Sequence, residues 1–173
     1  CDDGSDYDFY TLRHARHGMQ PSFLDFLKAT SPRRWWPFAG RHDRPHMTSF
    51  VIACPEARRL LDVSCMAGQQ RWNEGWWPLA VQSGQMHIGN HSWDHRHDAL
   101  PQALRPRRAP GSFFPVDSPE EADKQVRQAA NYIRSHAPNP ADDLFAYPYG
   151  HVPDWLADDW LPNDAGTRAA FTT

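Results

Sequence analysis

The sequence lacks long apolar runs, a strong charge of either sign and any pattern of paired cysteines. No apolar run approaches the roughly 20 residues that a membrane-spanning helix needs. The net charge of the 173 residues is only −3, which gives no electrostatic reason to expect nucleic acid or an anionic membrane as the main partner. No secretory signal is recognisable either. The compartment of the protein therefore stays open.

Cysteine is scarce as well. The chain has three cysteines, Cys1, Cys54 and Cys65, and no CxxC spacing. This pattern is not that of a disulfide framework or of a thiolate zinc site, so buried or incidental thiols are expected. The chain opens on Cys1 instead of a methionine and ends on an apparent strand, and we expect a piece to be missing at both ends. The oligomeric state cannot be read from the sequence.

The composition that is present fits one folded domain over residues 1–173, because 40% of the residues are hydrophobic and 23% are charged. The chain also has eight tryptophans. Such residues anchor a core, but the apolar faces of sugar rings also stack on indoles. Both interpretations stay open: a tryptophan-rich core, or a groove for a carbohydrate.

Apolar runs alternate with amphipathic segments along the chain. The expected strands are 47–54, 86–90, 143–147 and 166–173, and the expected helices are 21–30, 55–63, 71–85, 118–137 and 152–162. A further helix could start between residues 6 and 17, and residues 31–46 are expected to be irregular. Strands that alternate with helices predict an α/β fold with a parallel sheet, open or closed.

Chemically reactive side chains gather in three regions of the chain. Asp2 and Asp3 open the chain, the stretch IGNHSWDHRHD covers residues 88–98, and YPYG covers residues 147–150. In parallel α/β folds, the C-terminal ends of the strands form one rim that carries the chemistry. The three regions are therefore expected to meet there.

Among the ten histidines are three pairs whose members lie four residues apart. His91 and His95 have no helix breaker between them and lie just beyond a predicted strand, so they are the best candidates for a metal grip. The other pairs are His42/His46, interrupted by Pro45, and His87/His91, which spans Gly89. Taken alone, the pair His91/His95 could also belong to a solvated loop.

A catalytic zinc takes three protein ligands and keeps a position for water. Asp2 and Asp3 are candidates for the third ligand, and the repulsion between them is tolerable if one binds a cation and the other accepts a proton. An Asp-Asp-Gly turn is the structural alternative. The YPYG segment is either a plain turn or a place where a backbone N–H points at an oxyanion.

Together, Cys-Asp2-Asp3-Gly, His91-Ser-Trp-Asp-His95 and Ala146-Tyr-Pro-Tyr-Gly resemble the polysaccharide deacetylases of the NodB-homology type, carbohydrate esterase family 4. The motifs of that family read roughly [TF]-[FY]-D-D-G, H-[ST]-x-x-H and R-x-P-[YF]-G, in the same order and with similar spacing. The resemblance covers most of the chain.

The resemblance implies a distorted (β/α) barrel with one divalent metal ion, commonly zinc, with cobalt or nickel as alternatives. Asp3, His91 and His95 would be its ligands. Asp2 would be the general base, and the backbone N–H of Tyr149 would stabilise an oxyanion. Pro148, Tyr149 and Trp93 would contact an N-acetylated carbohydrate, and the products would be acetate and a free amine.

The chain departs from the family pattern at two places. Ala146 stands where the family usually has an arginine that orients the base, and this variant is similar to the branch that includes poly-N-acetylglucosamine deacetylases. The late histidine that serves the family as general acid has no match, which leaves His97 and His151 as substitutes. Asp98 could orient a ligand histidine or lie in solvent.

The predicted function is metal-dependent removal of N-acetyl groups from a sugar or polysaccharide. A non-catalytic carbohydrate-binding protein on the same scaffold and an amidohydrolase acting on a non-sugar C–N bond are the alternatives. The sequence names neither the polysaccharide nor the metal.

Overall fold

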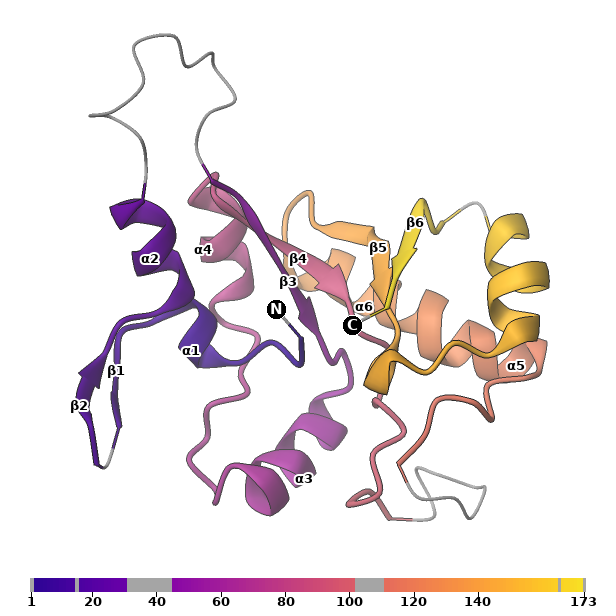
Figure 1. The fold of residues 1–173 in the computed structure, drawn as a ribbon, viewed down its shortest axis with the longest axis horizontal. Helices are drawn as coiled ribbons and strands as arrows, with labels where there is room; N and C mark the ends of the chain where they lie inside the picture. Colours follow the sequence, from indigo (N-terminus) through magenta and orange to yellow (C-terminus); the bar gives the residue numbers. More distant parts are fainter. Residues whose placement is uncertain (1, 15, 31–44, 102–110, 165, 173) are drawn as a thin grey trace, which may run out of the picture.

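The computed structural model describes residues 2–14, 16–30, 45–101, 111–164 and 166–172. Most of the segment predicted to be irregular, including His42, lies outside these residues. A four-stranded parallel sheet forms the centre of the molecule (Figure 1). Its strands, in spatial order, are β3 (Met47–Val51), β4 (Met86–Asn90), β5 (Ala141–Ala146) and β6 (Ala169–Phe171). All four predicted strands are present, so the expected α/β class is confirmed.

The expected distorted barrel is not found in the described residues. The sheet is open, with β3 and β6 at its edges. Closure into a barrel requires the two edge strands to pair with each other, and in the four-stranded parallel sheet of the described residues they do not. The strands of an open parallel sheet still end on one edge, so the three regions of reactive side chains can meet there.

Helices connect the strands and cover the sheet. They are α3 (Pro55–Cys65), α4 (Trp77–Gln82), α5 (Pro119–Ala122), η1 (Asp123–Gln128), a π-helical stretch, and α6 (Ala129–His136). Both α4 and α6 contact β4. Ser118 caps α5 by accepting a hydrogen bond from the Glu121 N–H, as its position before Pro119 predicts. By contrast α4 is much shorter than its predicted range, since residues 71–76 form turns and irregular structure.

The N-terminal region differs most from expectation. A helix does start in the segment 6–17, but it is the short α1 (Asp6–Phe9), and an antiparallel hairpin of β1 (Leu12–His14) and β2 (Gly18–Gln20) follows it. Figure 1 shows this hairpin projecting away from the central sheet. The helix α2 (Phe23–Ala29) is confirmed, and its Ser22 cap forms a reciprocal capping box with Asp25.

Three short helical segments lie between β5 and β6 in the C-terminal part of the chain. They are η2 (Pro148–Gly150), η3 (Leu156–Trp160) and η4 (Leu161–Asn163). Side chains of η3 and η4 pack with those of β5 and the segment around Phe113 in one buried cluster. A second cluster lies between the other half of the sheet and α4 and α6, and includes Trp76 and Trp77. These two tryptophans are core anchors and take no part in a surface groove.

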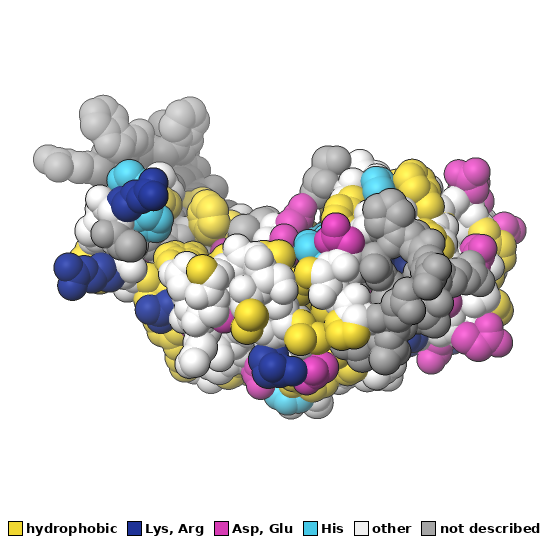
Figure 2. All heavy atoms as spheres, turned by 90° about the horizontal axis from the view of Figure 1, so that it is seen from below, with side chains coloured by type: hydrophobic (Ala, Val, Ile, Leu, Met, Phe, Trp, Pro, Cys, Tyr) yellow, Lys and Arg dark blue, Asp and Glu magenta, His cyan; other side chains and the backbone are white. Residues whose placement is uncertain are grey.

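No helix in the described ranges is long and apolar enough to cross a bilayer. Figure 2 shows that the Lys and Arg side chains visible on one face lie mostly toward the hairpin end, and Asp and Glu mostly toward the end that carries η3.

Candidate metal centre

His91 lies immediately after β4, where the sheet holds it rigidly. Its backbone N–H donates to the Val51 carbonyl at 3.0 Å, which extends the pairing of β4 with β3. The side chain is only 2% exposed. The Nδ1 atom lies 2.9 Å from the carbonyl oxygen of Ala146 at the end of β5. Because a carbonyl only accepts, Nδ1 carries the proton and Nε2 presents a lone pair.

The turn that follows brings His95 back toward His91. Ser92 and His95 have φ values of 71° and 60°, a left-handed conformation that non-glycine residues rarely adopt. Two hydrogen bonds hold it: the Ser92 N–H donates to Asn90 Oδ1 at 2.9 Å, and the His95 N–H donates to Ser92 Oγ at 3.0 Å. The two imidazole rings end 4.9 Å apart between centroids. Strain of this kind is typical of sites that must present side chains in a fixed geometry.

Asp94 anchors the same turn from behind. Its carboxylate is 1% exposed and accepts from the Arg96 N–H at 3.0 Å and from Gln125 Nε2 at 2.9 Å, and it pairs with Lys124 at 3.0 Å. Lys124 and Gln125 belong to η1, so the turn is tied to the helical layer. Asp94 thus has a positioning role that the motif pattern alone did not reveal.

Asp3 reaches the site from the N-terminal segment. Its φ of 65° is also left-handed, and its carbonyl accepts a hydrogen bond of 2.9 Å from Trp72 Nε1. Next to it, Gly4 has a φ of 50° and lies so close to Val51 that a Cβ atom would overlap that side chain. Further along, Asp6 holds the backbone and side chain of Asn73 at 3.1 and 3.0 Å. The segment 3–6 is therefore fastened both to β3 and to the connection before α4.

The three predicted ligands converge. Asp3 Oδ1 lies 3.6 Å from His91 Nε2 and 3.3 Å from His95 Nε2. One ligand atom of each of the three residues lies within 4.8 Å of the others, and among the described residues this is the cluster of His, Cys, Asp and Glu side chains with the geometry of a metal site. Asp2 is half-buried beside it, where its charge acts on both Asp3 and His91.

The protonation states of the two histidines leave electron-pair donors facing one another in this cluster. Burial lowers the pKa of His91, and burial together with the neighbouring imidazoles lowers the pKa of His95 to about 2. Both rings are therefore neutral at pH 7, and His91 Nε2 carries no proton. A carboxylate oxygen facing that lone pair is repelled, and Asp3 Oδ1 is buried with no hydrogen-bond donor.

A divalent cation resolves this arrangement, because all three atoms are electron-pair donors. Two imidazole nitrogens and one carboxylate oxygen are a ligand set that zinc accepts, and cobalt and nickel follow closely in the affinity series. Burial raises the pKa of Asp3, so cation binding must displace a more tightly held proton there. The residues present fit a divalent metal ion.

The turn after β5 forms the next wall of the site. Tyr149 has a φ of 60°, and its ring lies 4.4 Å from that of His95. Pro148 is buried below it. The side chain of Ala146 is buried, and its carbonyl orients His91. The structure thus places Tyr149 next to His95, whereas the contact of Pro148 and Tyr149 with a substrate remains a prediction.

The contacts of Trp93 differ from those of Pro148 and Tyr149. It is half-buried, packs against two core clusters and meets Tyr132 edge-on at 5.8 Å. Its backbone carbonyl also accepts from the Cys54 N–H. These contacts account for the residue as a packing anchor, and its predicted role in substrate binding stays a prediction.

His97 and His151, the two substitutes for a missing acid, both lie near Tyr149. Their ring centroids are 6.4 and 5.3 Å from the Tyr149 ring, and His97 is also 6.0 Å from His95. Asp98 contacts His97 Nδ1 at 3.0 Å, so its carboxylate pairs with that residue. Of the two alternatives for Asp98, the structure shows an exposed carboxylate, with 64% of the side chain accessible, and the Nδ1 atom of His91 faces the Ala146 carbonyl.

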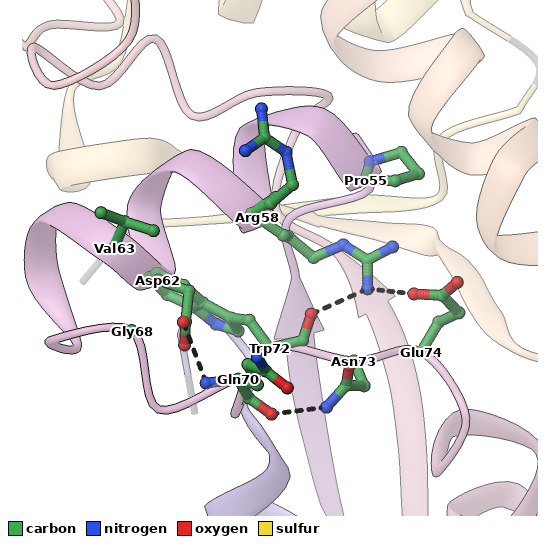
Figure 3. A pocket seen from close by; sticks show the side chains of 10 residues that line it. Pro55, Arg58, Asp62, Val63, Gly68, Gln70, Trp72, Asn73 and Glu74 are labelled. Atoms are coloured by element: carbon green, nitrogen blue, oxygen red, sulfur yellow. Dashed lines mark hydrogen bonds and ion pairs between the residues drawn. The ribbon is translucent and has the colours of Figure 1, made fainter.

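A pocket of about 420 Å³ lies beside the metal centre, between α3 and the connection 68–74 (Figure 3). Trp72 lines it and also holds Asp3, so the indole separates the pocket from the ligands. Arg58 lies in its wall, paired with Glu74 at 2.7 Å and with the Trp72 carbonyl at 3.3 Å (Figure 3). The Asp62 carboxylate accepts from the N–H groups of Gln70 and Arg71. Sequence patterns did not single out Trp72, Asp62 or Arg58, because their contacts are made with residues distant in the chain.

Comparison with known proteins decides the family. The sequence profile described as Polysaccharide deacetylase matches residues 67–164, more than half of the chain. The chain belongs to the polysaccharide deacetylase family. The match includes His91, His95 and the turn 148–150, whereas Asp2 and Asp3 precede it. Asp3 is therefore linked to the two histidines by the geometry described above.

A crystal structure of a candidate polysaccharide deacetylase from Bacillus anthracis has the same fold, with a TM-score of 0.55 at 13% sequence identity. The alignment covers 99% of the present chain and 38% of the Bacillus anthracis chain. This polysaccharide deacetylase chain thus spans well under half the length of its structural neighbour. No curated protein matches the sequence significantly.

Proposed function

We propose that the protein is a metal-dependent hydrolase that removes N-acetyl groups from an N-acetylated polysaccharide. The observation that carries the proposal is the approach of Asp3 Oδ1 to the lone pair of His91 Nε2 at 3.6 Å, with His95 Nε2 3.3 Å from the same oxygen. A divalent cation would be bound by all three of these electron-pair donors. Membership of the polysaccharide deacetylase family supports the substrate class.

Asp3, His91 and His95 would hold the divalent metal, with zinc as the first choice. When bound, the ion would supply Lewis-acid polarisation of the amide carbonyl and a water of lowered pKa. Asp2, which is half-buried, would act as the general base that accepts a proton from the attacking water. The backbone N–H of Tyr149, held in its left-handed turn, would donate to the developing oxyanion.

Hydrolysis of an amide also requires a proton for the departing amine. His97 lies close to His95 and Tyr149, and is paired with Asp98. His151 also contacts Tyr149, with the two ring centroids 5.3 Å apart. Either imidazole could deliver the proton, and the chemistry requires only one of them.

A non-catalytic, carbohydrate-binding role is the second candidate, and Ala146 favours it. The buried Ala146 side chain supplies no charge to orient Asp2. Release of acetate from N-acetylglucosamine oligomers distinguishes the two roles, because a binding protein retains the ligand unchanged.

The test combines metal content with acetate release. Purified protein supplemented with zinc is expected to hold one ion per chain by mass spectrometry of the metal, and His91→Ala is expected to lose it. His87→Ala is the matched control, since His87 lies on β4 four residues earlier and outside the cluster. Full metal content in the His91 variant, or equal loss in the His87 variant, would refute the site. Absence of acetate release from metal-loaded wild-type protein would refute the enzymatic role.

A further inference from the structure

The N-terminal hairpin and the helix that follows it form one unit at one end of the molecule (Figure 1). The Thr11 hydroxyl, just before β1, donates a hydrogen bond to the Asp25 carboxylate on α2, so side chains join the two elements. The Ser22 N–H donates to the same carboxylate at 2.9 Å. We call the hairpin β1–β2 together with α2 the N-terminal arm. The three candidate metal ligands lie outside this arm.

The N-terminal arm exposes three large apolar side chains. Met19 is 61% exposed, Phe26 is 55% exposed and Phe23 is 45% exposed. Phe23 and Phe26 lie three positions apart on α2 and therefore share one face of the helix. Leu24 is buried in the core cluster and attaches the helix to the body of the protein. Large apolar side chains gathered in this way are typical of an interaction surface.

The same arm carries fixed positive charges. Arg13 lies directly opposite Met19 in the register of the hairpin, so the two side chains lie on one face of the strands. Arg16 lies between the two strands, and Lys28 lies in the last turn of α2. Asp25 is the only acidic residue of the arm. The exposed apolar side chains are therefore accompanied by an excess of cations.

This combination fits an anionic lipid surface. Apolar side chains enter the boundary between head groups and acyl chains, while neighbouring cations pair with the head-group phosphates. An acidic protein would need a pocket for each apolar side chain, whereas a fluid bilayer accommodates them without one.

The net charge of −3 for the whole chain is compatible with such a contact. A charged surface acts mainly on groups within a Debye length, about 10 Å at roughly 0.1 M salt. Figure 2 shows the visible Lys and Arg side chains mostly toward the hairpin end, and Asp and Glu mostly toward the end that carries η3. The arm can thus approach a bilayer while most of these acidic side chains stay away from it.

We propose that the N-terminal arm docks the protein reversibly on an anionic lipid surface, with its three exposed apolar side chains in the interface and its three cations against the head groups. The contact is reversible because only a few side chains insert. This inference stands apart from the proposed function, since docking requires neither the metal nor the carbohydrate.

Sedimentation with lipid vesicles tests the proposal. The purified protein is expected to bind vesicles made of equal parts of phosphatidylcholine and phosphatidylglycerol, and to bind vesicles of phosphatidylcholine alone about tenfold more weakly or less. Salt at about 1 M is expected to release the protein, because the Debye length falls to about 3 Å. Equal binding to both kinds of vesicle, or binding to neither, would overturn the proposal.

Met19→Ser is expected to weaken binding to the anionic vesicles roughly three- to tenfold, because the inserted apolar surface is lost. Met19→Trp is expected to bind at least as tightly as wild type, since indole favours the membrane interface. Val63→Ser is the matched control, because Val63 is 64% exposed and lies on α3, outside the arm. No loss in Met19→Ser, or an equal loss in Val63→Ser, would contradict the role of the arm. Phe26→Ser repeats the test on α2.

Arg13→Gln is expected to weaken binding to the anionic vesicles about fivefold and to leave binding to phosphatidylcholine unchanged. Arg59→Gln is its control, since the Arg59 side chain on α3 is 64% exposed and pairs with Glu56. An equal effect of the two substitutions would show that only the total charge matters, against the proposal.

Light scattering on the same samples tests the rival occupant of this surface. Wild-type protein that self-associates without binding vesicles, and that becomes monomeric as Met19→Ser, would identify a second copy of the chain as the partner and overturn the lipid contact. Circular dichroism is expected to give the wild-type spectrum for every variant, because the substituted side chains are exposed.

Discussion

The indole Nε1 of Trp72 donates a hydrogen bond of 2.9 Å to the carbonyl oxygen of Asp3, across 69 positions of the chain. It fixes the backbone of a residue whose φ is 65° and whose carboxylate must face two histidines. The contact thus holds the backbone of a proposed metal ligand, as hydrogen-bonded partners commonly do around metal sites.

Trp72→Phe is expected to weaken zinc binding about tenfold, because Asp3 loses the donor that holds its carbonyl. The fold should persist, since one hydrogen bond contributes about 1 kcal/mol. Competition against a chromophoric chelator measures the affinity, and the visible spectrum of the cobalt form reports ligand geometry. Trp160→Phe is the control, because Trp160 packs at η3 against Arg127. Equal affinities in all three proteins would contradict the role of Trp72.

Asp2→Asn is expected to retain one metal ion per chain and to lose acetate release by at least about a hundredfold, the usual contribution of a general base. Asparagine keeps the size of the side chain but cannot accept the proton. Metal analysis and acetate release are measured on the same sample. Undiminished release would remove Asp2 from the mechanism, and loss of the metal would make it a ligand.

The buried Asp8 predicts a pH dependence of stability. Burial raises its pKa to about 6, against which the hydrogen bond of 2.5 Å from Ser49 acts only in part. The folded state thus holds this proton more tightly than the unfolded chain, in which the pKa is 3.8. The contribution of Asp8 to stability is therefore full below about pH 4 and is lost as the pH rises through about 6, by about 3 kcal/mol.

Asp8→Asn removes this dependence while keeping an oxygen that accepts from Ser49. Relative to wild type, the variant is expected to gain stability between pH 4 and pH 7. Urea unfolding at several pH values measures the difference. Parallel curves for the two proteins would show that Asp8 does not titrate in this range.

Gly4→Ala is expected to destabilise the protein by about 3 kcal/mol, because the new Cβ would overlap Val51 and the φ of 50° disfavours a side chain. Gly18→Ala is the control, since Gly18 has a φ of 72° but open space around it, and about 1 kcal/mol is expected there. Denaturant unfolding measures both. A smaller cost at Gly4 than at Gly18 would show that segment 3–6 moves easily away from β3.

The sequence by itself determined the elements whose signals are local. The strand β4, the helix α3, the capped start of α5 and the turn after β5 follow from runs, caps and breakers within a few residues. The motifs also carried the resemblance to the polysaccharide deacetylases and, through it, the choice of Asp3, His91 and His95.

Only the tertiary structure decided which distant atoms meet. It gave an open sheet in the described residues where a barrel was expected, placed the hairpin β1–β2 after a short first helix, and showed that the Ala146 carbonyl orients His91. It also gave Trp72 its position. The reason is physical: secondary structure depends on neighbours along the chain, whereas these contacts depend on how the strands are ordered and how the connections cross them.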